Sequence, residues 1–238
     1  MQAYLALLRI DLAQLCRSWL VRGWVLLLAL PAFFLVVVAA NEHESASETL
    51  AAYIAAVLAP LSWLAISILS ASAVNSESHV IADSFLSRSV TRRTYIWAKI
   101  TSRLCVFLTV YFVVTIPLSY LMTRYAIGDT SAGGIAGGLL MVSTLFVFLA
   151  TFGIALSTIF RNVQFAIVSV LLVALLSGLA LQFLGLNWMS ATTVLSELPA
   201  TFRGETPVWE QVRVLFAFSA LAITATMAGV WHFRRKDL

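Results

Sequence analysis

The sequence predicts an all-α membrane protein. Hydrophobic residues make up 61% of the 238 residues and charged residues only 11%, whereas soluble domains carry roughly 45–50% and about 25%. A helix needs about 20 apolar residues to cross a ~30 Å hydrocarbon core. No strict alternation of apolar and polar residues runs through the apolar stretches, which excludes a transmembrane β-barrel. Six stretches qualify as spans, at residues 23–40, 51–74, 104–122, 137–160, 166–184 and 214–231.

The basic residues predict the topology of these six spans. Twelve of the 15 Lys and Arg residues fall at the two termini or in the 75–103 and 161–165 connections, together with 4 acidic residues, whereas the opposite side carries 3 basic and 7 acidic residues. Basic residues of short loops stay in the cytoplasm. Both termini are therefore expected in the cytoplasm, with the chain crossing the cell membrane (inner or plasma membrane) several times. The net charge of +4 is explained by this asymmetry, without invoking nucleic acid.

Residues 1–19 predict an amphipathic helix that lies in the cytoplasmic interface, where its apolar face contacts membrane lipids. Arg9 and Asp11 interrupt the apolar run, and no small-residue cleavage site follows, so a signal peptide is rejected. The leucines that recur at helical spacing are Leu5, Leu8, Leu12 and Leu15.

Two features inside the spans bear on packing. Pro60 and Pro117 each remove a backbone hydrogen bond and predict a kink in their helices. Small residues also recur four positions apart, which lets helices approach closely. We favour packing within one chain as the reason for these pairs, with a seam between two subunits as the alternative. The pairs are Ala52/Ala56, Ala55/Ala59, Gly133/Gly137, Gly134/Gly138, Gly153/Ser157 and Ala225/Gly229.

Several classes of function lack their motifs. No charged residue lies deep in a span, which argues against an ion-coupled transporter. The chain has no P-loop, no metalloprotease motif and no hydrolase nucleophile motif. We therefore expect no catalytic residue, metal or cofactor in this chain. Cys16 and Cys105 both fall near the cytoplasmic side, which predicts free thiols.

The most informative segment is residues 75–103, between the second and third spans. Two acidic residues, Glu77 and Asp83, precede a dense basic run, and Thr91 is placed to cap a helix that enters the third span. Phe85, Tyr95 and other apolar side chains interrupt an otherwise polar connection. The segment is either a positively charged membrane anchor or a short helix that docks in a partner's groove.

This segment resembles the coupling loop in permease subunits of type-2 ABC exporters. That loop typically has a Glu, then Gly-Thr-Leu, Leu-Leu-Ser-x-Pro-Val-Ser-Arg, and an aromatic residue before Gly/Ala-Lys. Here Glu77 matches the acid, residues 85–88 and 90–92 match the central stretches, and Tyr95 and residues 98–99 match the end. The C-terminal residues 231–238 (WHFRRKDL) are similar to the Phe-x-Arg-Lys-Asp-Leu tail of that family. Val80 stands where the family has Gly, and Ser89 where it has Pro.

The resemblance implies a single permease domain over residues 1–238, with an interfacial helix (1–19), a cytoplasmic coupling loop (75–103) and an outer loop (186–213). A second permease subunit, identical or different, and two copies of an ABC ATPase subunit would complete the transporter. That ATPase would hold ATP and Mg²⁺. The alternative is a non-transporting scaffold or accessory subunit of a membrane complex. The resemblance implies ATPase docking through Glu77, Asp83, Phe85, Arg88, Arg92, Arg93, Tyr95 and Lys99.

Overall fold

The computed structural model describes residues 2–75, 91–160 and 162–235. These residues are helical apart from short connections, and within them the one sheet-like pairing is an isolated bridge between Ser45 and Ile127. The elements are α1 (Gln2–Arg17), α2 (Trp19–Glu42), α3 (Ala46–Tyr53), η1 (Ile54–Leu58), α4 (Ala59–Asn75), α6 (Arg92–Tyr125), α7 (Ala132–Ile159), α8 (Val163–Phe183), η2 (Asn187–Met189), α9 (Ala191–Ser196), α10 (Leu198–Arg203) and α11 (Val208–Arg235).

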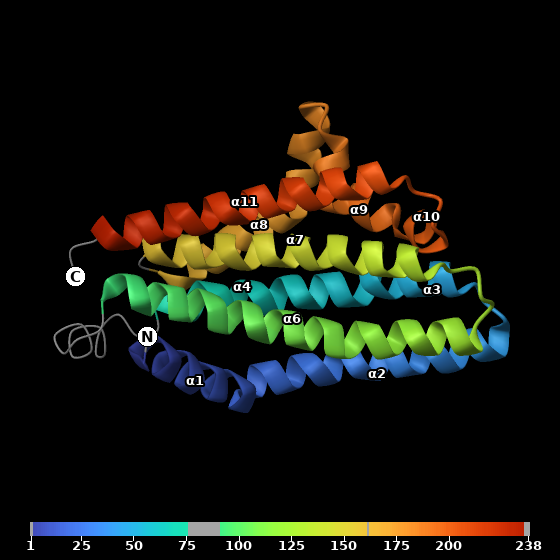
Figure 1. The fold of residues 1–238 in the computed structure, drawn as a ribbon, viewed down its shortest axis with the longest axis horizontal. Coiled ribbons are helices and arrows are strands. Elements are labelled where there is room, and N and C mark those ends of the chain that lie inside the picture. The colour runs from blue at the N-terminus through green and yellow to red at the C-terminus, as the bar shows by residue number, and fades with distance from the viewer. Residues whose placement is uncertain (1, 76–90, 161, 236–238) are drawn as a thin grey trace.

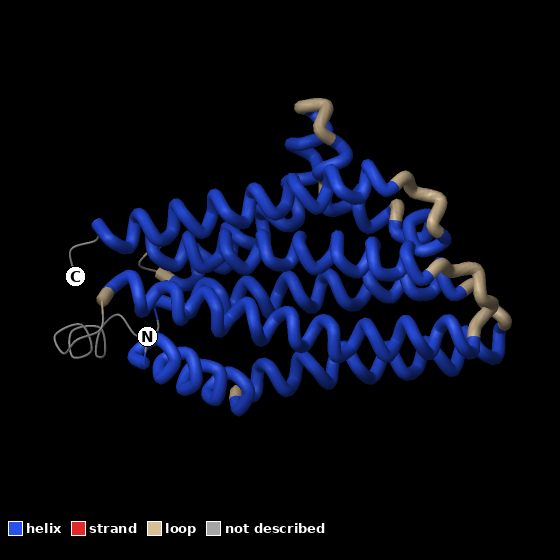
Figure 2. Tube along the Cα trace, viewed as in Figure 1, coloured by secondary structure: helices blue, strands red, loops and turns tan. Residues whose placement is uncertain are grey.

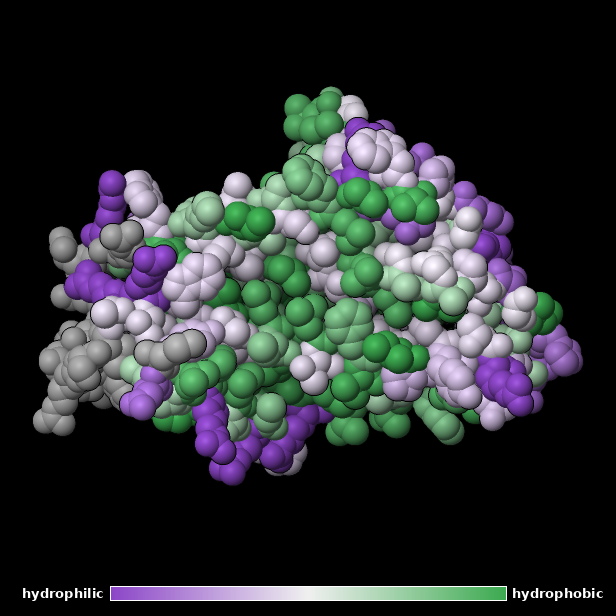
Figure 3. All heavy atoms as spheres, viewed as in Figure 1, coloured by the Kyte–Doolittle hydropathy of each residue, from purple (hydrophilic) through white to green (hydrophobic). Residues whose placement is uncertain are grey.

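The long helices run side by side along the long axis of the molecule, and the start of α1 and the end of α11 lie at the same end (Figure 1). The short connections and short helices gather mostly at the other end (Figure 2). Hydrophobic side chains cover the middle of the visible face, while hydrophilic ones gather toward both ends (Figure 3). This banding is typical of a bundle that crosses a bilayer.

Five helices in the described residues are long and apolar enough to cross a membrane, and they confirm a multi-pass all-α membrane protein. α8 matches the fifth predicted span, and its described apolar run covers Val163–Gly178. The count of six spans and the cytoplasmic side of the termini stay predictions. The five helices are Trp19–Glu42, Ala46–Ala73, Arg92–Tyr125, Ala132–Ile159 and Val208–Phe233.

Two predicted connections contain more helix than expected. The third span was predicted to begin at residue 104, but residues 92–103 of the predicted coupling loop already form the first three turns of α6, after the cap predicted at Thr91, and α6 is 34 residues long. Residues 186–213 were predicted as an outer loop, but they contain η2, α9, α10 and the start of α11. Phe202 of α10 is fully buried, so this segment is part of the packed core.

The second span is one continuous helical segment with a π-helical turn in the middle. η1 joins α3 to α4, and the N–H of Ala59 donates to the carbonyl of Ile54, five residues earlier. Pro60 follows immediately and has no N–H to donate. A π turn therefore precedes Pro60, where the sequence predicts a kink, and α6 continues as one helix through Pro117.

Helix α7 packs tightly between α4 and α11. A Cβ on Gly153 of α7 would lie 2.0 Å from Oγ of Ser70 in α4, and a Cβ on Gly229 of α11 would lie 3.0 Å from Cα of Ala155. A Cβ on Gly138 would likewise meet the ring of Phe202 at 2.5 Å. These small residues therefore serve contacts within the chain, as favoured from the sequence.

Candidate functional site: the coupling end of the bundle

The predicted docking residues divide between the described residues and the rest of the chain. Glu77, Asp83, Phe85 and Arg88 lie outside the described residues. Arg92, Arg93, Tyr95 and Lys99 all belong to the first turns of α6. We use the name coupling end for these turns of α6 together with α1 and the last turns of α11.

Helix α6 begins at the cap that the sequence predicts. Thr91 has extended backbone geometry, and its hydroxyl oxygen accepts a hydrogen bond from the N–H of Thr94 at 3.2 Å. A threonine in this position accepts a hydrogen bond from one of the backbone N–H groups that have no acceptor within the first helical turn. From this start the helix rises for 34 residues, or about 50 Å at 1.5 Å per residue. The four described residues of the predicted docking set and the third span therefore belong to one continuous helix.

A buried ion pair fixes α1 to α6. Lys99 Nζ lies 2.6 Å from Oδ1 of Asp11, and each side chain is less than one-tenth exposed. The hydroxyl of Ser102 donates to the other carboxylate oxygen of Asp11. Nearby, the hydroxyl of Tyr4 donates to Oγ1 of Thr101 at 2.9 Å. The geometry therefore gives Lys99 a partner inside the chain, in contrast to the outward docking position that the resemblance implies.

An aromatic contact fixes α11 to α6 at the same end. The rings of Tyr95 and Phe233 are stacked with centroids 6.0 Å apart, and Nζ of Lys99 lies 5.6 Å from the centroid of Tyr95. Phe233 is only 3% exposed and belongs to a small apolar cluster that also draws on α4 and α7. The cluster consists of Ala73, Ile96, Ile100, Ile154 and Phe233. The two segments that carry the family resemblance, the coupling segment and the C-terminal tail, thus touch each other.

The outward side of the first turns of α6 remains open to a partner. Arg93 is exposed, and Trp97, one helical turn later, is 40% exposed. Arg92 is half-buried. At the end of α11 the guanidinium of Arg235 lies 4.0 Å over the ring of Trp231, and both residues are exposed. Exposed arginine and tryptophan side chains are typical anchors of protein interfaces.

Sequence reasoning missed Asp11, Ser102 and Phe233. Residues 4, 8, 11 and 15 share one face of α1, which is the face that meets α6 through Tyr4, Asp11 and Leu15. An acidic residue on the otherwise apolar stripe of an amphipathic helix indicates a buried cationic partner, and this signal was available. Leu5, which the sequence places on the apolar stripe, is 57% exposed, as a side chain that contacts lipid would be.

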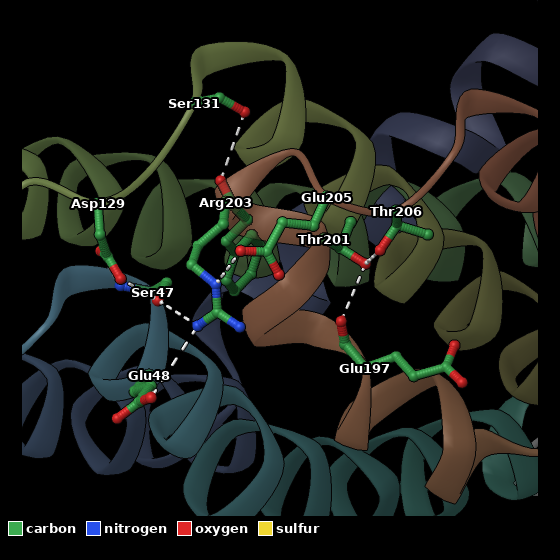
Figure 4. A network of polar contacts seen from close by, with 10 residues as sticks. Ser47, Glu48, Asp129, Ser131, Glu197, Thr201, Arg203, Glu205 and Thr206 are labelled. Atoms are coloured by element: carbon green, nitrogen blue, oxygen red, sulfur yellow. Dashed lines mark hydrogen bonds and ion pairs between the residues drawn. The ribbon is translucent and has the colours of Figure 1, made fainter.

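The opposite end of the bundle carries a separate polar network (Figure 4). Asp129 Oδ1 accepts the backbone N–H of Ser47 at 2.9 Å, and the other carboxylate oxygen accepts the Ser47 hydroxyl. Arg203 donates to Ser47 Oγ at 3.3 Å and to Glu205 Oε1 at 2.9 Å. The hydrogen bond to Glu205 raises the pKa of Arg203. The network links α3, the connection between α6 and α7, and the end of α10, which are distant in sequence, at this end of the bundle.

Comparison with models of known protein families gave no match for this chain, and comparison with curated proteins gave none either.

Proposed function

We propose that this chain is the membrane-spanning permease subunit of an ATP-driven ABC exporter, which forms the translocation path and docks a separate ATPase subunit. One observation carries the proposal. Residues 92–103, the described helical part of the segment that resembles a coupling loop, form the first turns of the 34-residue helix α6, and α1 and α11 brace these turns through buried contacts.

The proposed mechanism assigns different roles to the residues at the coupling end. Arg92, Arg93 and Trp97 present charge and aromatic surface to the ATPase, while Lys99 positions α6 against α1. ATP and Mg²⁺ stay in the partner. A displacement of the first turn of α6 by the closing ATPase is passed along α6, because the helix is continuous and its start is anchored on two sides.

A second permease subunit, identical or different, completes the proposed path. The end of α8 projects from the long side of the bundle (Figure 1), and its side chains Phe183 and Leu184 are 92% and 71% exposed. An apolar end that leaves its own bundle is suited to contact a neighbouring subunit. Two permease subunits with two ATPase subunits would form the transporter.

Co-purification tests the proposal. The chain is co-expressed with single-domain ABC ATPases from the same genome, purified in nanodiscs, and assayed for a co-eluting ATPase and its ATP hydrolysis. We expect a stable complex that is lost in the double variant Arg92→Glu/Arg93→Glu. The matched control is Arg124→Glu, an exposed charge reversal at the far end of α6, which should leave the complex intact.

Two results would count against the permease. A chain that elutes alone with every ATPase favours the scaffold or accessory subunit. The second result is a chain that binds an ATPase but keeps its biological activity after the ATP hydrolysis of that ATPase is abolished. This result also favours the scaffold or accessory subunit.

A further inference from the structure

A polar cavity lies between the end of α8, η2 and α9. Its volume is about 620 Å³, and six of the eight residues that line it are polar. Leu175 and Gly178 complete the wall on α8. The six polar residues are Gln182, Asn187, Ser190, Thr192, Thr193 and Glu197.

The opposite side of α8 faces an apolar cavity of about 240 Å³. Ala174 and Leu181 line that cavity, whereas Gly178 and Gln182 line the polar one. The segment after η2 alternates in the same way, with Ala191 in the apolar wall and Thr192 in the polar one. Apart from Ser177 of α8, the polar side chains of these two linings therefore face the first cavity.

Three polar side chains in this lining have no partner among the residues that the structure describes, whereas two hydroxyls pair with each other. Ser190 is buried, and its hydroxyl is paired with that of Thr192 at 2.6 Å. Within the described residues, the side chains of Gln182, Asn187 and Glu197 make no hydrogen bond or ion pair. All three side chains are exposed, so their polar groups are free to bind water or a polar ligand that enters the cavity.

Glycine keeps this cavity open at its narrowest wall. A Cβ on Gly178 would lie 3.0 Å from both Oγ of Ser190 and Oγ1 of Thr192, closer than a side chain normally approaches. Any larger residue at this position would push into the hydroxyl pair. The absence of a side chain on Gly178 therefore preserves the space in front of the two hydroxyls.

The charge and hydrogen-bonding capacity of the lining select the ligand. Glu197 is the one charged residue in the lining, so the cavity has a formal charge of −1. The two amides and three hydroxyls both donate and accept hydrogen bonds. We infer that the cavity binds a ligand in which a cationic amine is joined to hydroxyl or phosphate oxygens. The inference rests on the proposed function, where this ligand is the cargo or its headgroup.

Two sources offer this chemistry, an amine-bearing lipid headgroup and a free amino alcohol. Both are tested with one reporter. In a Cys16→Ser/Cys105→Ser background, the variant Gln182→Cys is placed in phosphatidylglycerol nanodiscs. Its labelling rates with a cationic and an anionic methanethiosulfonate reagent are measured relative to a free thiol. Asn187→Cys serves as a second reporter in case the first variant folds poorly.

We expect labelling by both reagents, with the cationic one favoured. By Coulomb's law in a water-like medium, a neighbouring unit charge acts with opposite sign on the two reagents and changes the ratio of their rates by about tenfold. In Glu197→Gln the ratio of cationic to anionic labelling rates should fall by about tenfold. Both proteins sit in the same lipid, so its surface charge affects both ratios equally and cancels when they are compared. Gly178→Leu should slow labelling by both reagents.

Protection identifies the source of the ligand. Millimolar ethanolamine should slow labelling where ethylene glycol does not if the ligand is a free amine. Phosphatidylethanolamine added to the nanodisc should slow it if the ligand is a lipid headgroup. A thiol that neither reagent reaches, rates that ignore Glu197, or no protection by either amine would overturn the inference. No ATPase enters this assay, so its failure is distinct from failure of the proposed function.

Discussion

Lys99 of α6 and Asp11 of α1 form a buried ion pair with 2.6 Å between Nζ and Oδ1. The pair joins the helix that follows the coupling segment to the helix that opens the chain. The ion pair holds α1 and α6 together at the end of the bundle where we propose that the ATPase docks.

Breaking this pair on one side should destabilise the protein strongly. Asp11→Ala or Lys99→Ala leaves one buried charge without its partner, which costs about 3–5 kcal/mol. The double variant Asp11→Leu/Lys99→Met removes both charges and should stay within about 1 kcal/mol of the wild type. Ser102 keeps an acceptor, because its hydroxyl also reaches the carbonyl of Lys99 at 3.0 Å. Unfolding in mixed micelles measures all three, with Arg93→Ala as the exposed control. A double variant no better than the singles would contradict the pairing.

Phe233 should be the main anchor of α11 at the coupling end. Phe233→Ala removes a buried ring that stacks on Tyr95 and should cost about 3–5 kcal/mol. Phe233→Leu keeps most of the apolar volume and should lose less. Thermal unfolding in nanodiscs gives the order of the variants. Trp97→Ala, at a partly exposed position of the same end, is the control and should change stability little. Equal losses in the two alanine variants would show that the cluster does not hold α11.

Gly153 should be intolerant of any side chain. In Gly153→Ala the new Cβ would lie 2.0 Å from Oγ of Ser70 and 2.9 Å from its Cβ. Overpacking of this kind costs about 1–3 kcal/mol. The second-site change Ser70→Gly removes both atoms and should restore much of the stability. Gly133→Ala, where a Cβ meets nothing within 4 Å, should be harmless. Unfolding midpoints of the four proteins test this, and a failed rescue would place the strain elsewhere.

Asp129 should act as the N-cap of α3 from a distant part of the chain. Ser45 occupies the cap position without a capping side-chain hydrogen bond, and Asp129 accepts the N–H of Ser47 instead. Asp129→Ala should therefore cost about 0.5–2 kcal/mol, as loss of a cap does. Asp129→Asn keeps an acceptor and should lose less. Thermal unfolding checks the difference, and equal losses would assign the effect to charge alone.

The class of protein and the start of α6 were predictable from local signals. Apolar stretches of sufficient length predict spans, and Thr91 before an apolar-periodic run predicts a helix start. The N-terminal boundary of the third span, at Arg92 of α6, was not predictable from hydropathy. Lys99 and Arg103 are charged, so the apolar stretch begins after them, yet both are buried in α6. A hydropathy value depends on the local sequence alone, so it does not include the ion pair with Asp11 that allows Lys99 to be buried.

Segment 186–213 was predicted as an outer loop, but a proline and a glycine within it fit a short helix. Pro199 lies in the first turn of α10, where a missing N–H costs little. Gly204 ends the same helix with a φ of 82°, a conformation that suits glycine. Burial of Phe202 against Gly138 then decides the packing of the segment. The contact between Phe202 and Gly138 joins residues far apart in sequence, so no local sequence pattern predicts it.

The buried ion pair also implies an order of assembly during synthesis. Asp11 and Lys99 are 88 residues apart, so at about 5–20 residues per second the acid precedes its partner by roughly 4–18 s. Until Lys99 is made, the carboxylate of Asp11 lacks the cation that pairs with it in the bundle. The contact between α1 and α6 therefore forms only after the two long apolar segments between them, α2 and the segment from α3 to α4, have been made.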